Sequence, residues 1–396
     1  MTGHALDRAG PGRLIGRETI GRVLEALRAP GEETRIVGGA VRNALLGRAV
    51  TEIDLATSAL PDDTMRRARA AGLKAIPTGF EHGTVTVVAD GEPFEVTTLR
   101  EDVETDGRHA IVRFGRSFRQ DALRRDFTIN ALSVDREGRL HDHTGGLDDL
   151  AAGRVRFIGA PRGRIREDYL RILRFFRFSA EYADGPLDPD GLAACVHERE
   201  GLEFLSRERV RAEFLKVLVA RRAGEVVAVL SETGMLLRLA GGVAELGRFG
   251  RAVRAELDPV ARLAALLVLS PADPPRLRER LRLSNAEHEQ VVTFARVLGR
   301  LKSPGVVDRA EMRRLAANFG LKPLLDTLTV VAGEPRPAVC PQGDAQLGLF
   351  RSGEETAPVF GLTGAALLRQ GIPPGPEIGR RLAEAKSAWM EAGCPA

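Results

Sequence analysis

Two carboxylates stand two residues apart at Glu52 and Asp54, shortly after a pair of glycines. Oxygen ligands suit a divalent cation such as Mg²⁺, and on a strand residues i and i+2 point to the same face. The glycines Gly38 and Gly39 follow a short β-rich run, and a helix beginning after them would present its N-terminus and Arg42 to a phosphate. Each feature alone indicates only a turn or a solvated strand face. Together they predict metal-assisted phosphoryl transfer.

A second group of polar side chains lies in the segment RRDFTINA. Arg125 supplies a forked donor, Asp126 a carboxylate and Asn130 an amide, all close to one turn. Such groups can bind the phosphates and ribose hydroxyls of a nucleotide. By itself the segment would indicate a surface salt-bridge cluster. Residues 108–125 carry six arginines against one acidic residue, which favours a surface that faces phosphates.

A third group follows in the segment EDYLRILRFFRF. The spacing predicts a helix over 168–180, with Asp168 and Arg171 on one face. An acceptor beside a donor can read the edge of cytosine or adenine without a template strand. Arg174 and Arg177 continue around the helix and could reach phosphates. For this segment alone, an amphipathic helix with ion pairs is the alternative.

Together the three groups resemble the active-site signature of the DNA polymerase beta nucleotidyltransferase superfamily. The form is that of class II tRNA nucleotidyltransferases (CCA-adding enzymes) and bacterial poly(A) polymerases. Their pattern GGxVRD…LLG…DxDLAT is matched except at two positions, where Asn43 replaces an Asp and Glu52 replaces the first Asp of DxD. Glu is one methylene longer but still ligates Mg²⁺, so we expect catalysis to survive in weakened form. The motifs RRDxxxNA and EDxxRxxRxxR are matched throughout, and the resemblance covers roughly residues 30–390.

The resemblance implies template-independent addition of CCA to the 3′ end of tRNA. Its substrates would be CTP and ATP, its cofactor Mg²⁺ and its second product pyrophosphate. Glu52 and Asp54 would hold the metal, and Asp168 and Arg171 would select the base. Glu95 is a candidate for a third carboxylate, with a purely structural strand residue as the alternative. The remaining predicted site residues would bind the nucleotide: Gly39, Arg42, Arg125, Asp126, Asn130, Arg174 and Arg177.

Other activities stay open within and outside this family. CC addition and poly(A) synthesis are the alternatives within it. The resemblance implies that the segment between Arg100 and Gln120 is a flexible loop needed for adding the terminal A, and its presence argues against CC addition alone. The Gly-Arg-Arg-Phe-Arg type element of bacterial poly(A) polymerases is absent near residues 76–83. A non-catalytic RNA-binding relative, suggested by Glu52, is opposed by the complete nucleotide-selecting motif.

These residues require an α/β scaffold to position them. Short β-rich runs and turns prevail up to about residue 150, among them a predicted hairpin over 84–99, and the apolar spacing beyond is helical almost throughout. We therefore expect an α+β fold. A polymerase-beta-like head with a mixed sheet and helices would be followed by an all-α neck, body and tail. The expected domains are the catalytic head 1–150, the nucleotide-selecting and RNA-binding neck 151–235, and the tRNA-binding body and tail 236–396.

The composition is that of a globular protein with more than one core. The 396 residues are 43% hydrophobic and 28% charged, which excludes a disordered or fibrous chain. Only five of the 58 basic residues are lysine, and coding bias explains most of the arginines, but the net charge of +6 over 154–177 exceeds the +4 of the whole chain. Three widely spaced cysteines, and His141 and His143 without a second cluster, predict no zinc site. With no visible signal peptide or membrane span, we expect a cytoplasmic protein without membrane contact or obligate protein partner.

Overall fold

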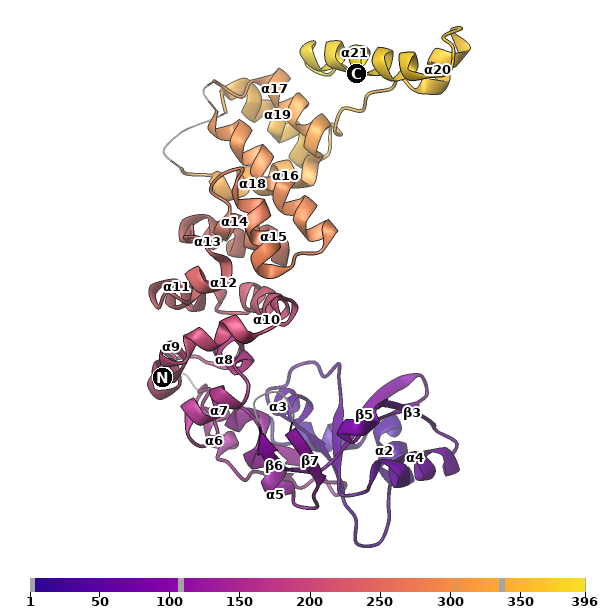
Figure 1. Ribbon diagram of the computed structural model, residues 1–396, viewed down its shortest axis with the longest axis vertical. Helices are drawn as coiled ribbons and strands as arrows, with labels where there is room; N and C mark the ends of the chain where they lie inside the picture. The colour runs from indigo at the N-terminus through magenta and orange to yellow at the C-terminus, as the bar shows by residue number, and fades with distance from the viewer. Residues whose placement is uncertain (1–3, 106–109, 304, 335–338, 396) are drawn as a thin grey trace. The chain divides into compact units, whose positions relative to one another are not determined.

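Contacts between residues divide the chain into two units, Met1–Leu205 and Ser206–Ala396 (Figure 1). All the predicted site residues belong to the first unit. The predicted functional domains have other boundaries and stay a prediction. The computed structural model describes the backbone of residues 4–105, 110–303, 305–334 and 339–395, and the side chains of these except 101–105 and 110–113.

A mixed sheet forms the centre of the first unit. Its strands are β1 (Thr34–Val37), β2 (Asp54–Thr57), β3 (Lys74–Gly79), β4 (Thr84–Ala89), β5 (Glu92–Thr98), β8 (Ser133–Val134) and β9 (Leu140–His141). They lie in the order β3-β4-β5-β2-β1-β8-β9, and only the β2–β5 pair is parallel. The predicted hairpin is confirmed as β4 and β5, which meet at Asp90 and Gly91 with positive φ at both. The expected mixed sheet is confirmed as well.

The two faces of this sheet differ in polarity. Side chains such as Val85, Val87 and Val96 are buried on the face covered by α2 (Glu18–Ala26) and α4 (Pro61–Ala70). Strand residues alternate between faces, so their neighbours point the other way. On that other face Asp54 and Glu95 are exposed. The sheet thus separates an apolar core from a polar surface that carries carboxylates.

A hairpin of β6 (Arg100–Thr105) and β7 (Ala110–Phe114) forms a second, two-stranded sheet. It occupies much of the segment 100–120, for which a flexible loop was expected. Residues 106–109 of that segment lie outside the described residues. Two strands therefore replace an irregular backbone over part of the expected loop.

Aromatic side chains join the rest of the first unit to the sheet. The ring of Phe127 lies 4.9 Å from that of Phe157, 6.3 Å from Phe175 and 5.4 Å from Phe178. These contacts pack α8 (Leu170–Tyr182) against the segment that carries Arg125 and Asn130. The other helical elements of this unit are α1 (Gly10–Ile15), α3 (Gly39–Leu45), η1 (Phe80–His82), α5 (Phe118–Leu123), η2 (Thr128–Asn130), α6 (Gly146–Ala151), α7 (Pro161–Glu167), α8 (Leu170–Tyr182), α9 (Pro189–His197) and η3 (Arg199–Phe204).

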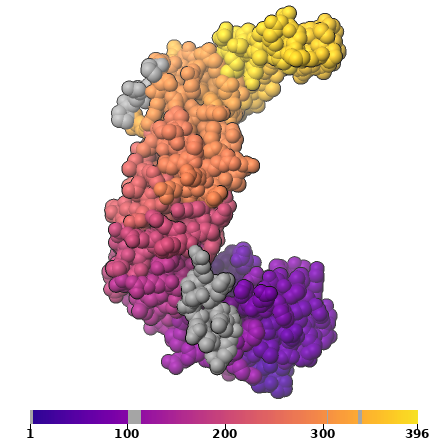
Figure 2. Space-filling view, viewed as in Figure 1, coloured from indigo at the N-terminus to yellow at the C-terminus, as the bar shows by residue number. Residues whose placement is uncertain are grey.

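The second unit is helical in its described residues, as expected. The helical spacing predicted for this part of the chain is thereby confirmed, and Ser206 caps the first of these helices by accepting from the backbone N–H of Arg209. In Figure 2 the surface of this unit changes colour in chain order, through orange to yellow. None of the described helices is long and apolar enough to cross a bilayer. They are α10 (Arg207–Val219), α11 (Ala223–Glu232), α12 (Met235–Ala240), α13 (Leu246–Arg254), α14 (Pro259–Leu267), α15 (Asp273–Leu281), α16 (Asn285–Lys302), α17 (Arg309–Phe319), α18 (Leu321–Val331), α19 (Pro341–Ser352), α20 (Gly364–Arg369) and α21 (Pro376–Glu391).

Candidate active site

A glycine turn connects β1 to α3. Gly38 has φ +69° and ψ −123°, a conformation that needs glycine, and a Cβ there would lie 3.0 Å from Nη1 of Arg125. Helix α3 begins at Gly39, so Arg42 follows on its first turn. The turn therefore brings Arg42 and Arg125 close to one another.

The carboxylates of Glu52 and Asp54 lie at the start of β2. The prediction that both stand on one strand is wrong, because the strand begins at Asp54. Asp54 pairs with Val37, the last residue of β1, and the Gly38 turn leaves Glu52 no strand partner. Ile53 is buried between them, and the residues Glu52 and Asp54 both keep solvent-exposed surface.

A third carboxylate adjoins Asp54 on the polar face of the sheet. Glu95 of β5 is the register partner of Asp54. Partial burial of the Asp54 carboxyl and the charge of Glu95 raise its pKa, with Glu52 adding to the effect and Arg125 opposing it. Crowded carboxylates repel one another, and a divalent cation would relieve that repulsion.

Asp126 is the centre of a buried hydrogen-bond network. Its Oδ2 accepts from Nε and Nη2 of Arg174 at 2.7 Å each. Its Oδ1 accepts from Nδ2 of Asn130 at 3.0 Å and from the backbone N–H of Phe127 at 2.8 Å. Burial acts to raise the pKa of Asp126, but the charge of Arg174 and these hydrogen bonds together hold it below its ordinary value. Asp126 therefore positions Arg174 and Asn130 as an ionised carboxylate.

The helix predicted over 168–180 forms but begins two residues later, because an interruption at Asp168 and Tyr169 separates α7 from α8. Helix α7 ends before Asp168, whose backbone is extended (φ −155°, ψ 106°), and α8 begins two residues later. Asp168 and Arg171 therefore do not share a helix face, and that prediction is wrong. Oδ1 of Asp168 accepts from the backbone N–H of Leu170 at 3.1 Å. The side chains of Asp168 and Arg171 approach the site from a turn and from the first helical turn after it.

The interruption has a cause in tertiary packing. The ring of Tyr169 lies against Gly201, where a Cβ would be only 1.8 Å from Cδ1 of the ring, and its centroid is 6.0 Å from that of Phe204. Glu198, on the same side, accepts hydrogen bonds at 2.9 and 3.1 Å from two arginines of α7. The segment 198–204 thus holds the end of α7 and the start of α8 separately.

One cavity of about 490 Å³ collects nearly all the predicted residues. Arg177 does not line it; its guanidinium lies 4.2 Å from the ring centroid of Phe178, which does. A smaller cavity of about 250 Å³ is lined by Asp54, Glu95 and Arg125 among others. The larger cavity is lined by Gly38, Gly39, Arg42, Glu52, Asp54, Arg124, Arg125, Asp126, Asn130, Asp168, Arg171, Arg174 and Phe178.

Known proteins are similar to this chain in sequence and in fold. The family model "Poly A polymerase head domain" matches residues 34–156, and "Probable RNA and SrmB- binding site of polymerase A" matches residues 186–245. The mitochondrial CCA tRNA nucleotidyltransferase 1 of Homo sapiens is 35% identical over 376 residues, covering 91% of this chain and 83% of that protein. The CCA-adding enzyme of Lactobacillus johnsonii is 31% identical over 384 residues, 93% and 92% of the two chains. The chain belongs to the CCA-adding enzyme family.

A solved member of the CCA-adding enzyme family has the same fold. The Bacillus stearothermophilus enzyme, crystallised in complex with CTP, superposes with a TM-score of 0.69 at 28% identity. The alignment covers 97% of this chain and 93% of the other. The expected fold class and family are therefore confirmed.

Sequence reasoning missed two side chains that shape this family's site in the present chain, Asp121 and Tyr182. Asp121 is buried and accepts from Nε of Arg124 at 2.8 Å and from Nη2 of Arg125 at 3.1 Å. Tyr182, at the end of α8, donates to Asn43 and accepts from Arg42. The spacing of Asp121 to Arg125, i to i+4 on α5 and its end, was a usable signal. Tyr182 had none, since it lies 140 residues from Arg42.

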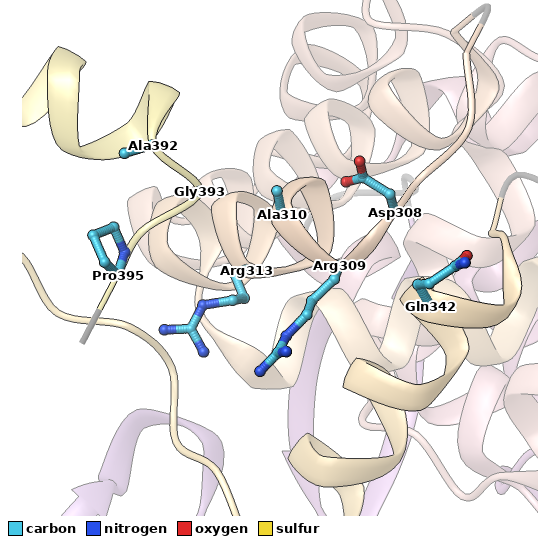
Figure 3. Close-up of a pocket in the computed structure, with 8 residues that line it drawn as sticks. All are labelled: Asp308, Arg309, Ala310, Arg313, Gln342, Ala392, Gly393 and Pro395. Atoms are coloured by element: carbon cyan, nitrogen blue, oxygen red, sulfur yellow. The ribbon is translucent and has the colours of Figure 1, made fainter.

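Two further features lie outside the site expected for the CCA-adding enzyme family. Glu33, Asp135 and His141 bring ligand atoms within 4.8 Å of one another, a grouping that the sequence did not suggest. Arg139 and His141 bind the carboxylate of Asp135, and Arg35 binds Glu33, so Arg139 and Arg35 already supply positive charge to these acids. In the second unit a cavity of about 640 Å³ lies between α17, α19 and residues 392–395 and contains no predicted site residue (Figure 3).

Proposed function

We propose that this chain adds CCA to the 3′ end of tRNA, using CTP and ATP and releasing pyrophosphate. The observation that carries the proposal is the single cavity of about 490 Å³ lined by carboxylates, forked arginine donors, and Asp168 with Arg171. The name of the human relative describes a tRNA nucleotidyltransferase, and that of the Bacillus structure a complex with CTP. The residues that line this cavity are therefore of the types that nucleotide transfer to tRNA requires.

We further propose that Glu52 and Asp54 hold Mg²⁺, with Glu95 as a third carboxylate beside them. The donors are all oxygens, as Mg²⁺ prefers. Burial first, and then the charges of Glu95 and Glu52, raise the pKa of Asp54. When bound, the ion would polarise the α-phosphate and ease deprotonation of the attacking 3′ hydroxyl. Glu52 enters from irregular backbone rather than a strand, which gives the longer side chain room to adapt.

The remaining residues would bind and orient the nucleotide. Arg42 and Arg125 flank the Gly38–Gly39 turn and would take the phosphates. Hydrogen bonds from Asn130 and Arg174 to Asp126 hold these two side chains in place. They would therefore already be positioned when the ribose and the phosphates of the nucleotide bind. Asp168 offers an acceptor and Arg171 a donor for the edge of the base. Arg177 would add positive charge from one helical turn beyond the cavity.

The decisive experiment measures product length. A tRNA transcript that lacks its CCA end is incubated with Mg²⁺ and with CTP, ATP or both. Three added residues support CCA addition, two support CC addition, and a long A ladder supports poly(A) synthesis. Binding of tRNA without any product would support a non-catalytic relative and refute the proposal. Asp54→Asn should abolish transfer, and Asp62→Asn, an exposed change on α4 beneath the opposite face of the sheet, is its matched control.

Partners and compartment follow from the same proposal. The partners are the 3′ end of tRNA and nucleoside triphosphates, and the helices of the second unit would bind the tRNA by shape and backbone contacts. We keep the cytoplasm as the proposed compartment, although the human relative is named as a mitochondrial protein. Fractionation of cells that express a tagged full-length chain would test it.

A further inference from the structure

Arg42 is a buried cation whose hydrogen-bond partners are all neutral. The residue is 6% exposed. Nη2 donates to the hydroxyl of Tyr182 at 2.8 Å, Nη1 donates to Oδ1 of Asn130, and Nε and Nη2 donate to Oδ1 of Asn43 at 3.3 and 3.2 Å. The guanidinium also lies 4.1 Å from the centroid of the Tyr182 ring. Every contact orients the group, and none of these partners carries a negative charge.

The described residues offer no ion pair to Arg42. Arg48, just beyond the same helix, pairs with Glu181 at 2.6 Å. Asp126 is the carboxylate whose charge acts on the pKa of Arg42, and this carboxylate is already bound by Arg174. Burial, and then the positive charge of Arg177, lower the pKa of Arg42, opposed by Tyr182 and Asp126. A buried cation whose charge is incompletely compensated destabilises the ligand-free protein. It also strengthens the binding of any anion that reaches it.

Asn43 decides whether this charge stays uncompensated. Its Oδ1 accepts from Arg42 and also from the hydroxyl of Tyr182 at 3.3 Å, while its Nδ2 donates weakly to the carbonyl of Ala49 at 3.5 Å. This hydrogen bond identifies Oδ1 as the atom that faces the guanidinium. A carboxylate at position 43 would keep the acceptor and add a negative charge within the same distance. Either Asn or Asp at position 43 can therefore orient Arg42, but only Asp would also neutralise its charge.

We propose that Asn43, together with Tyr182, holds Arg42 in place without neutralising it, so that the triphosphate of the incoming nucleotide supplies the missing counter-charge. Asn43 is then a positioning residue that sets affinity for the triphosphate and leaves base choice alone. The inference rests on the proposed function only in naming a nucleoside triphosphate as the ligand. The site is the wall of the cavity formed by α3, and the ligand class is a polyphosphate.

The test compares Asn43→Asp with the parent protein in direct binding measurements without RNA. The probes are CTP with Mg²⁺ and, as a ligand with one phosphate, CMP. We expect the variant to bind CTP about tenfold more weakly, equivalent to about 1.4 kcal/mol, and CMP within twofold of the parent. The preference for CTP over UTP should not change. The ligand-free variant should melt at a higher temperature, because an ion pair then compensates the buried guanidinium.

Two further variants separate charge from geometry. Asn285→Asp is the matched control, since Asn285 of the second unit also accepts from an arginine, at 2.8 Å, far along the chain from the cavity residues. It should leave CTP binding unchanged. Asn43→Ala removes the acceptor without adding charge and should weaken CTP binding less than Asn43→Asp does. An equal loss in both would overturn the inference, because the lost hydrogen bond would then explain the effect.

The outcomes distinguish this inference from the proposed function. Equal CTP affinity in Asn43→Asp and the parent overturns the inference, whether or not RNA is extended. A parent protein that binds CTP but extends no RNA refutes the proposed function, and the comparison of variants can still be read. A parent that binds no CTP overturns both.

Discussion

The ion pair between Asp126 and Arg174 should anchor α8 to the sheet side of the first unit. Asp126→Asn keeps the size of the side chain and the acceptor for Asn130 and the backbone of Phe127. It removes the charge and turns an amide N–H toward the guanidinium of Arg174, which donates to Oδ2 in the parent. The perturbation is therefore confined to one pair of hydrogen bonds and one charge.

The size of the effect follows from the exposure of the two partners. Breaking a fully buried ion pair costs about 3–5 kcal/mol, because the remaining charge stays buried and unpaired. The side chain of Asp126 is 9% exposed, but that of Arg174 is 31% exposed and can be partly rehydrated. We therefore expect a loss of about 2–3 kcal/mol, somewhat below the fully buried case.

Hydrogen exchange can measure this loss where it occurs. The chain has two units, and a single unfolding free energy is not defined unless they unfold together. Exchange of the α8 amides should accelerate by about 30- to 150-fold, which corresponds to 2–3 kcal/mol at about 1.4 kcal/mol per factor of ten. The amides of α14 and α16 in the second unit are the internal control and should not change.

A double-mutant cycle with Arg174→Met tests the pairing itself. If the pair anchors α8, the double variant should be less destabilised than the sum of the single changes, because neither partner is left alone. An Asp126→Asn protein whose α8 amides exchange within threefold of the parent would refute the reasoning. The packing of Phe127 against Phe175 and Phe178 would then suffice to hold α8.

The same carboxylate predicts a pH dependence. The pKa of Asp126 is held below its ordinary 3.8, so its stabilising effect is fully present above that value and is lost as the pH falls through the lower folded value. After correction for intrinsic exchange, protection of α8 in the parent should decline below about pH 4. The Asp126→Asn profile should be flatter over the same range, and equally steep profiles would contradict the assignment.

Further predictions concern the metal site and base selection. Asp54→Asn should abolish nucleotide transfer yet raise the metal-free melting temperature by about 1–2 °C, since repulsion from Glu95 and Glu52 is removed. Chelation by EDTA should stop transfer and lower the melting temperature of the Mg²⁺-bound protein, because the metal then no longer relieves the repulsion among these carboxylates. Arg171→Ala should reduce discrimination among the four nucleotides about 5- to 150-fold, measured as the ratio of kcat/KM values. Gly201→Ala should displace the ring of Tyr169 and so raise misincorporation, whereas Tyr169→Phe, which keeps the ring, should not.

Sequence alone could predict which residues share the site, because the chemistry is concentrated in short local motifs. The glycine turn, the segment around Asp126 and the segment around Arg171 each lie within a dozen residues, and their types specify phosphate, metal and base contacts. The apolar periods that predict the strands and the helices of the second unit are local as well. Nearly every predicted residue accordingly lines one cavity.

The failures have a different physical origin, since both depend on distant packing. Asp168 leaves the helix because Tyr169 packs on Gly201, which lies more than thirty residues later, and no local rule contains that contact. Glu52 leaves the strand because β1 ends at the Gly38 turn and offers it no hydrogen-bond partner. In both cases tertiary packing overrides the secondary structure that the local sequence pattern predicts. The carboxylates of Asp168 and Glu52 nevertheless line the cavity.

Helix α8 links the two ends of the site. Arg171 is on its first turn, Arg174 binds Asp126 on the next, and Tyr182 supports Arg42 from its last residue. Eleven residues of helix span roughly 16 Å, so one rigid element reaches from the base-reading end to the phosphate-binding end. Any repacking that shifts α8 must therefore change base choice and phosphate binding together. Asn43 lies on α3 and meets α8 at Tyr182, the last residue of that helix, so a substitution at position 43 should act at the phosphate-binding end and leave the base-reading side chains in place.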